Sequence, residues 1–325
     1  MNEYIAITKK AIIENTVTEF DLFLKSYVNG HARYILFSRG NEQFTPERKE
    51  ELLSKNVQEF YISNEDTDKY LRYQEKNLKH IVEDGSKSSC EISGALYQVA
   101  SNLTQDILND PASGQNIQRT SEWVNNTIIH IAQNENTFSS LLEVTSHDYQ
   151  TYTHSINVSI IGLLFGRYLS LKQHELNSLG KGLLLHDIGK ATLPTELIRK
   201  HENLTKEEFN KIKKHPKAGL DLLEHNSSID SLSLKVVIQH HENYDGSGYP
   251  YGLGGGDIHL FGHISRIIDA YDVMTSNRSY AAAKGPFATL EAIKEKMPNC
   301  FNDELLKEFI CFLGPKEQRN KAKAV

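Results

Sequence analysis

Histidines and aspartates recur at regular intervals through the second half of this sequence. The candidates are His154, His186, Asp187, His215, His240, His241 and Asp269. About 25 to 32 residues separate one member or pair from the next, roughly the length of one helix and one loop. Successive helices of a bundle could therefore project these side chains into one central site. Imidazole and carboxylate groups gathered in this way are typical of a metal centre.

Each of these residues also has a simpler explanation when it is taken alone. A lone histidine at a helix end usually caps the helix or is partly buried, and His240 and His241 could do so with help from the helix dipole. His186 and Asp187 could form a buried ion pair. However, Asp187 follows the apolar run "GLLL" almost directly, and burying a carboxylate without a partner is costly. A metal ion would supply that partner.

The composition of the candidate set indicates the type of metal. Five histidines and two aspartates, with no cysteine, suit first-row transition metals that bind imidazole. Seven ligands are too many for one metal that keeps open positions, so we expect a pair of metals with Asp187 as the bridging ligand. Metal pairs about 3.5–4 Å apart can stabilise both the attacking and the leaving oxygen in phosphoryl displacement.

Three short motifs resemble the signatures of a known family. "HDIGK" at His186–Lys190 resembles the signature of HD-superfamily phosphohydrolases. "HHENYDGSGYP" at His240–Pro250 and "YTHSINV" at Tyr152–Val158 resemble those of HD-GYP domains. The resemblance covers about residues 140–315, and an HD motif followed by a GYP motif at this spacing is a specific signal. It implies a helical bundle that holds two or three metals, usually iron or manganese, and hydrolyses cyclic di-GMP.

The resemblance also implies roles for individual residues. One metal would be bound by His154, His186, Asp187 and Asp269, and the other by Asp187, His215, His240 and His241. Asp187 and Lys190 would be the catalytic residues, and Lys190, Tyr249 and Arg278 would contact the substrate. We expect iron as the metal, with manganese as the alternative.

Several positions depart from the family pattern. Gln150 stands where members with a third metal have a glutamate, which predicts a two-metal site. Asn243, His263 and Ala281 stand where basic residues are common. The set of metal ligands is therefore complete, whereas fewer cations than usual would face the substrate.

The first hypothesis is a metal-dependent phosphodiesterase that hydrolyses cyclic di-GMP to linear pGpG, with GMP as a further product, through a hydroxide that bridges the metals. Two alternatives stay open. One is a catalytically weak or inactive receptor that binds a cyclic dinucleotide or a partner protein. The other is a phosphodiesterase for a different cyclic dinucleotide.

The elements that must position these residues are mainly helical. Apolar residues recur at helical spacing from about residue 131 onward, and strand patterns are nearly absent there. The N-terminal part instead has strand-like runs at Ala32–Ser38 and Val57–Ser63. We predict a mainly α fold, with a smaller N-terminal α+β domain before an all-α HD-GYP helical bundle. The predicted boundaries are 1–85 for a regulatory α+β domain, 86–130 for a helical linker, 131–317 for the HD-GYP domain and 318–325 for a tail.

Composition limits the class of partner. A net charge of −6 argues against general nucleic-acid binding. No run of 18 apolar residues predicts a membrane helix, and the N-terminus lacks a signal-peptide pattern. We therefore expect a cytoplasmic protein with neither a membrane nor a nucleic-acid partner. A protein signalling partner would bind the N-terminal domain or the lip that the GYP motif forms.

Overall fold

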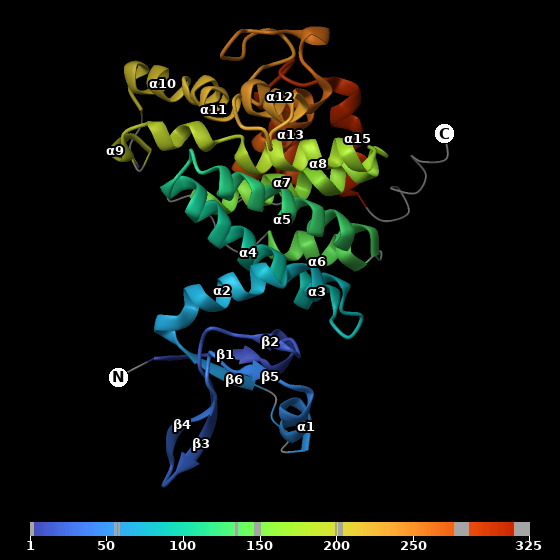
Figure 1. The fold of residues 1–325 in the computed structure, drawn as a ribbon. Helices are drawn as coiled ribbons and strands as arrows, with labels where there is room; N and C mark the ends of the chain where they lie inside the picture. The colour runs from blue at the N-terminus through green and yellow to red at the C-terminus, as the bar shows by residue number, and fades with distance from the viewer. Residues whose placement is uncertain are drawn as a thin grey trace. The chain divides into compact units, whose positions relative to one another are not determined.

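The computed structural model describes residues 3–54, 57, 59–133, 136–145, 151–198, 200, 204–275 and 286–314. The chain divides into two compact units, Met1–Val99 and Ala100–Val325. In the described residues, strands lie in the first unit and helices make up the second (Figure 1). The mainly α fold with a smaller N-terminal α+β part is confirmed. The domain boundaries at residues 85, 130 and 317 stay a prediction.

The first unit is built on an antiparallel sheet with the strand order β1-β6-β3-β4. Its strands are β1 (Tyr4–Thr8), β3 (Leu22–Val28), β4 (His31–Ser38) and β6 (Glu59–Ser63), and a second, two-stranded sheet pairs β2 (Thr16–Val17) with β5 (Gln43–Phe44). Asn29 and Gly30 join β3 to β4 with φ values of 52° and 78°. Positive φ at both positions is what a two-residue hairpin requires, so this turn follows from the sequence.

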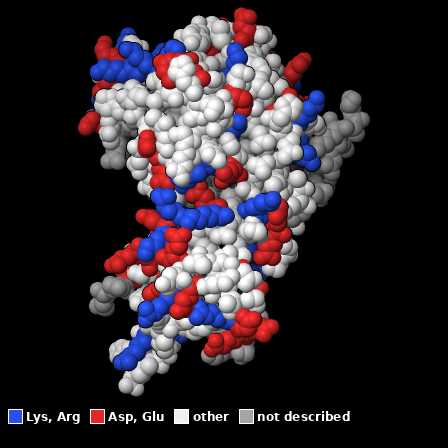
Figure 2. All heavy atoms as spheres, viewed as in Figure 1, with Lys and Arg blue, Asp and Glu red and all other residues white. Residues whose placement is uncertain are grey.

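Three helices accompany these strands: α1 (Pro46–Ser54), α2 (Thr67–Lys76) and α3 (Leu78–Glu83). Phe20, Leu22, Phe60, Ile62 and Tyr73 are among the buried residues of one apolar core that joins the sheet to α2. Charged side chains of the first unit pair mostly at its surface, as in the ion pair of Lys76 with Glu19. Figure 2 shows acidic and basic side chains interspersed on the visible face rather than gathered by sign.

The second unit is a helical bundle, which α4 (Ser89–Asn109) enters from the first unit. The following helices are α5 (Gly114–Gln133), α6 (Asn136–Val144), α7 (Thr151–Tyr168), α8 (Gln173–Leu185), α9 (Thr195–Ile198), α10 (Lys206–Ile212), α11 (His215–Leu223), α12 (Ser231–Gln239), α13 (Leu260–Thr275), α14 (Pro286–Lys296) and α15 (Asp303–Leu313). Two 3₁₀ turns, η3 (Ile188–Thr192) and η4 (Gly255–Asp257), interrupt this series. None of the described helices has the length and apolarity that a membrane crossing requires.

Helices α7, α8, α12 and α13 form the centre of this bundle, where α7 and α12 both contact α8 and α13 (Figure 1). Every residue from Thr153 to Gly166 on α7 is buried, as expected for a helix at the centre of a bundle. Gly189 lets η3 approach the start of α11 closely, because a Cβ atom on Gly189 would overlap the backbone of His215. The bundle thereby brings the ends of α8, α11 and α12 together around one point.

Candidate metal centre

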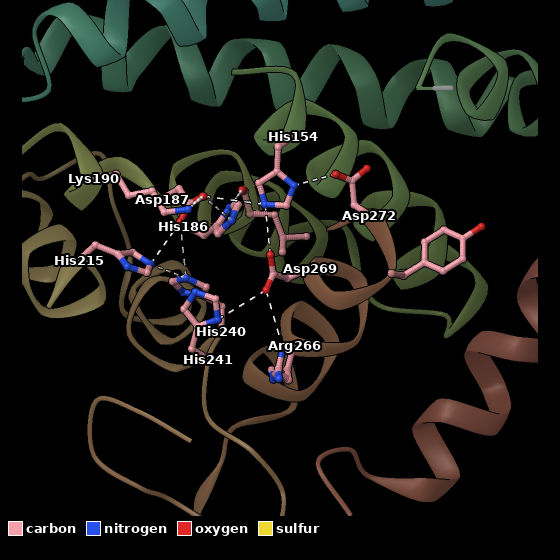
Figure 3. Close-up of polar contacts among 12 residues, drawn as sticks. His154, His186, Asp187, Lys190, His215, His240, His241, Arg266, Asp269 and Asp272 are labelled. Carbon is pink, nitrogen blue, oxygen red and sulfur yellow. Dashed lines mark hydrogen bonds and ion pairs between the residues drawn. The ribbon is translucent and has the colours of Figure 1, made fainter. Parts of the chain in front are cut away.

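The seven predicted ligands meet inside the second unit (Figure 3). His154 and Asp269 project from α7 and α13, two helices whose contact faces are buried. The other ligands lie at helix ends: His186 and Asp187 after α8, His215 at the start of α11, and His240 and His241 after α12. Helix ends are suitable positions because a side chain there can turn toward the bundle axis without interrupting a helix.

The ligand atoms fall into two groups, and within each group they lie within 4.8 Å of one another. One group is Asp187, His215, His240 and His241, and the other is His154, His186 and Asp269. These groups correspond to the two ligand sets that the family resemblance implies, with Asp187 as the residue common to both sets.

Asp187 lies between the two groups and presents one oxygen to each. Its Oδ1 atom is 3.2 Å from Nε2 of His215 and 3.8 Å from Nε2 of His240. Its Oδ2 atom is 3.4 Å from Nε2 of His186 and 3.9 Å from Nε2 of His154. A carboxylate in this position can share its two oxygens between two metal ions.

Three of the histidines are oriented by the backbone of the helix that precedes or contains them. In each, Nδ1 donates a hydrogen bond to a carbonyl three residues earlier, one of the groups left without a helical partner near a helix end. These bonds join His186 to Leu183 (2.7 Å), His215 to Ile212 (2.8 Å) and His240 to Val237 (2.9 Å). In a neutral ring with its proton on Nδ1, Nε2 carries a free lone pair. In these three rings that lone pair is available for a metal ion at the candidate centre.

Two features of the centre indicate that a cation fits it. Nε2 of His186 and Oδ1 of Asp187 are buried and have no hydrogen-bond partner among the described residues. Nε2 of His215 lies 3.0 Å from Nε2 of His240, although both rings use their Nδ1 protons elsewhere. Two lone pairs that face each other repel unless a positive charge lies near both, and unpaired buried polar atoms are costly. A divalent cation would resolve both conflicts.

The electrostatics of the centre agree with this conclusion. Burial acts against charge at His154, but hydrogen bonds with Asp269 and Asp272 raise its pKa to about 10. Burial also acts against charge at Asp187, but Lys190 holds the pKa of this carboxyl well below its usual range. Without metal, His154 and Lys190 thus provide positive charge beside two ionised carboxylates. A metal ion would take over part of this role at His154.

His240 and His241 behave in the opposite way. Burial lowers the pKa of each ring well below its usual value. Both imidazoles are therefore neutral around pH 7, and neutral imidazole is the form that binds a metal.

Comparison with known proteins matches residues 108–304 to the HD domain family. The chain belongs to the HD domain family. Its HD motif is His186-Asp187, the pair at the middle of the centre. The expected family resemblance is thereby confirmed.

Several curated relatives of this HD domain protein are named as cyclic dinucleotide phosphodiesterases. One, a cyclic di-GMP phosphodiesterase of Pseudomonas aeruginosa, is 31% identical over 209 residues, which cover 63% of this chain and 50% of the relative. The response regulator RpfG of Xanthomonas campestris, also named a cyclic di-GMP phosphodiesterase, is 35% identical over 127 residues, 39% of this chain and 34% of the relative. A 3′3′-cGAMP-specific phosphodiesterase of Vibrio cholerae is 30% identical over 155 residues, 47% of this chain and 29% of the relative. The chain thus spans half or less of the length of these relatives.

A solved structure has the same fold. An HDG"Y"P protein from Bdellovibrio bacteriovorus superposes with a TM-score of 0.66 and 19% sequence identity, covering 94% of this chain and 98% of the other. At this identity the likeness concerns the fold alone.

Lys190 and Tyr249, two predicted substrate contacts, lie beside the predicted metal ligands. Nζ of Lys190 is 2.6 Å from Oδ2 of Asp187. The ring of Tyr249 packs on His241 with a centroid distance of 4.7 Å, and Nζ of Lys213 lies 5.4 Å from its centroid. The third predicted contact, Arg278, lies outside the described residues, as do Gln150 and Ala281.

Glu242 organises the corner that carries Tyr249. Its buried carboxylate accepts hydrogen bonds from the backbone N–H groups of Tyr251 (2.7 Å) and Leu253 (3.0 Å). Gly248 approaches the backbone of Asn243 so closely that a Cβ atom would overlap it. The GYP motif therefore forms a tight corner against the end of α12, with Tyr249 on its inner side.

Two residues that contact predicted metal ligands, Asp272 and Arg266, were not identified from the sequence. Asp272 accepts a hydrogen bond of 2.7 Å from Nδ1 of His154 and so directs Nε2 of that ring toward Asp269. Arg266 lies near Asp269 on the side away from His154 (Figure 3). Both lie three residues from Asp269 on α13, one turn to either side, and that spacing is the signal that could have found them.

Proposed function

We propose that this chain is a metal-dependent phosphodiesterase that hydrolyses a cyclic dinucleotide. Cyclic di-GMP is the first candidate substrate, with linear pGpG and then GMP as products. The observation that supports this proposal most strongly is the position of Asp187, whose two oxygens face two separate groups of metal ligands. The names of the relatives support the reaction class and the substrate class.

Two metal ions would be held by the two groups, with Asp187 shared between them. Iron is the first candidate and manganese the second, since the ligands are imidazoles and carboxylates without thiolates. When bound, such a pair supplies Lewis-acid stabilisation of phosphoryl oxygens and lowers the pKa of a nearby water molecule.

The residues of the chain would bind and orient the substrate at this centre. The ammonium group of Lys190, half-buried beside Asp187, would lie close to the scissile phosphate and offset negative charge that develops there. Tyr249 would limit how the dinucleotide enters, because its ring covers His241. Arg278 would contact phosphate or a guanine edge through its planar fork.

The test is a hydrolysis assay on the full chain loaded with iron or manganese, paired with elemental analysis. We expect two metal ions per chain and metal-dependent release of the linear dinucleotide. Asp187→Ala should abolish the activity. The matched control is Asp221→Ala, which removes a surface aspartate paired with Lys217 and should leave the activity unchanged. Two metals per chain without any hydrolysis would contradict the proposed reaction.

A second candidate is a receptor that binds a cyclic dinucleotide with little turnover. The observation that favours it is the side chain of Asn243, which is neutral where the family resemblance implies a cation and which contacts Ser247 and Arg266. Calorimetric binding of cyclic di-GMP without product would support this candidate. A phosphodiesterase for another dinucleotide is the third, and a substrate panel that includes 3′3′-cGAMP distinguishes it. The cytoplasmic location and a protein signalling partner also stay proposals.

A further inference from the structure

Arg266 on α13 lies beside the metal centre without belonging to either ligand group. Its side chain is only 14% exposed. The guanidinium carbon lies 5.4 Å from the centroid of the Phe301 ring, a distance typical of a cation–π contact. Packing on Phe301 limits the orientations that the guanidinium group can adopt, and therefore the directions of its N–H groups. Arg266 has two partners: Asn243, which accepts a hydrogen bond, and Asp269, with which it forms an ion pair.

The first partner, Asn243, belongs to the corner. Nε of Arg266 donates a hydrogen bond of 2.8 Å to Oδ1 of Asn243. The amide nitrogen of Asn243 in turn donates to Oγ of Ser247 at 2.9 Å, and that hydroxyl donates to Asp245 at 2.6 Å. The bond from Arg266 therefore joins α13 to the corner at residues 243–247, and the corner leads directly to Tyr249.

The second partner, Asp269, belongs to the metal centre. Nη1 of Arg266 lies 3.8 Å from Oδ2 of Asp269, and Nδ1 of His241 lies 3.5 Å from the same oxygen. The other oxygen, Oδ1, is 3.1 Å from Nε2 of His154. Arg266 thus attracts one oxygen of the carboxylate while the other faces His154. This arrangement selects one rotation of the carboxylate about its bond to Cβ.

The residue types at both positions suit this arrangement. Arginine has a planar fork that can serve two acceptors at once, whereas lysine is a point charge. Asn243 is a neutral acceptor, so the positive charge of Arg266 stays available to Asp269. An aspartate at 243 would compete for that charge, and a basic residue would repel it.

From these contacts we infer that Arg266 is a positioning residue, with Asn243 as its partner: it orients Asp269 for metal binding and couples this ligand to the corner that carries Tyr249. The inference rests on the metal centre of the proposed function but not on its substrate. Groups that orient a metal ligand commonly change metal affinity about 10- to 100-fold when removed.

The experiment is a titration of the metal-free full chain with Mn²⁺, in which free Mn²⁺ is followed by electron paramagnetic resonance. In the unmodified chain we expect two binding steps. Arg266→Gln should raise the dissociation constant of the step that involves Asp269 by about 10-fold or more and leave the other step within about 2-fold. Arg266→Lys should recover part of the loss, because it restores the charge but not the fork.

The partner is tested by combining variants. Asn243→Ala should weaken the same step by a smaller factor, and in the Arg266→Gln background it should add little, since the bond is already absent. Arg167→Gln is the matched control, because Arg167 is an exposed arginine on α7, and both steps should be unchanged. Thermal unfolding of each metal-free variant reports on folding.

The inference is overturned if Arg266→Gln leaves both steps unchanged, or if it weakens both equally together with a loss of cooperative unfolding. It is also overturned if the two substitutions weaken binding additively. A chain that binds two Mn²⁺ ions but hydrolyses no dinucleotide would contradict the proposed function alone, because these titrations do not depend on turnover.

Discussion

The two units of the chain differ in where their charged side chains lie. In the first, the buried residues of the described apolar core are uncharged, and most ion pairs are at least partly exposed; in the pair of Lys76 with Glu19, more than 60% of each side chain is exposed. In the second, Asp187 and Asp269 lie deep in the bundle among buried histidines. Because burying charge is costly, the second arrangement persists only where something compensates for it. The contrast therefore locates the functional site without reference to any motif.

Among positions outside the predicted metal ligands, the largest effect should follow from Gly189→Ala. A Cβ atom at this position would overlap the carbonyl of His215, so α11 must shift and carry its metal ligand away. We expect a loss of about 3 kcal/mol in the free energy of unfolding and about 100-fold in activity, measured by chemical denaturation and the hydrolysis assay.

The matched control lies in the first unit. A Cβ atom on Gly94, in the second turn of α4, would meet nothing within 4 Å. Gly94→Ala should therefore stabilise the chain by about 0.5–1 kcal/mol through helix propensity. Destabilisation of similar size in both variants would remove the contrast between the units.

Asp272→Asn should have the next largest effect. The carboxylate of Asp272 holds the ring of His154 in the orientation that presents Nε2 to Asp269. An amide of the same size keeps the packing but loses the charge, so we expect metal affinity to fall about 10- to 100-fold. Mn²⁺ titration measures this change. Unaltered affinity would show that the backbone alone positions His154.

The stability of the metal-free chain should depend on pH through these buried groups. His154 has a folded pKa of about 10, above its unfolded value of about 6.5, so its contribution is fully present below 6.5 and is lost as pH rises toward 10. His240 and His241 have lowered values, so stability also falls as pH drops below about 6.5. Denaturation from pH 5 to 10 should show a maximum near neutrality, and Asp272→Asn should flatten its alkaline side.

The smallest effect should come from the surface of the first unit. Lys76→Ala removes an ion pair whose side chains are 64% and 63% exposed. Exposed pairs contribute little, because water and salt screen them. The unfolding transition should not move measurably at 0.15 M salt, and a clear destabilisation would mean that surface charge matters in the first unit as well.

The comparison also shows what sequence could and could not predict. Spacing alone predicted that residues from three helix ends and two further helices would meet, because a bundle permits few other arrangements. Asn29-Gly30 likewise predicts its hairpin turn locally. By contrast, Asp272 contacts His154, which lies 118 residues earlier in the sequence. Arg266 on α13 donates a hydrogen bond to Asn243, which lies in the corner after α12. The spacing of Asp272 and Arg266 from Asp269 could have marked both residues as neighbours of a predicted ligand. Their partners, however, depend on how helices rotate against each other, and single-sequence periodicity does not specify that rotation.

The most direct test of the central claim is the number of metal ions bound with and without the shared carboxylate. We predict two per chain in the unmodified protein and at most one in Asp187→Asn, by elemental analysis and Mn²⁺ titration, because both groups lose the same ligand. One ion or none in the unmodified chain, or two ions with unchanged affinity in the variant, would contradict the assignment of Asp187 as the bridge.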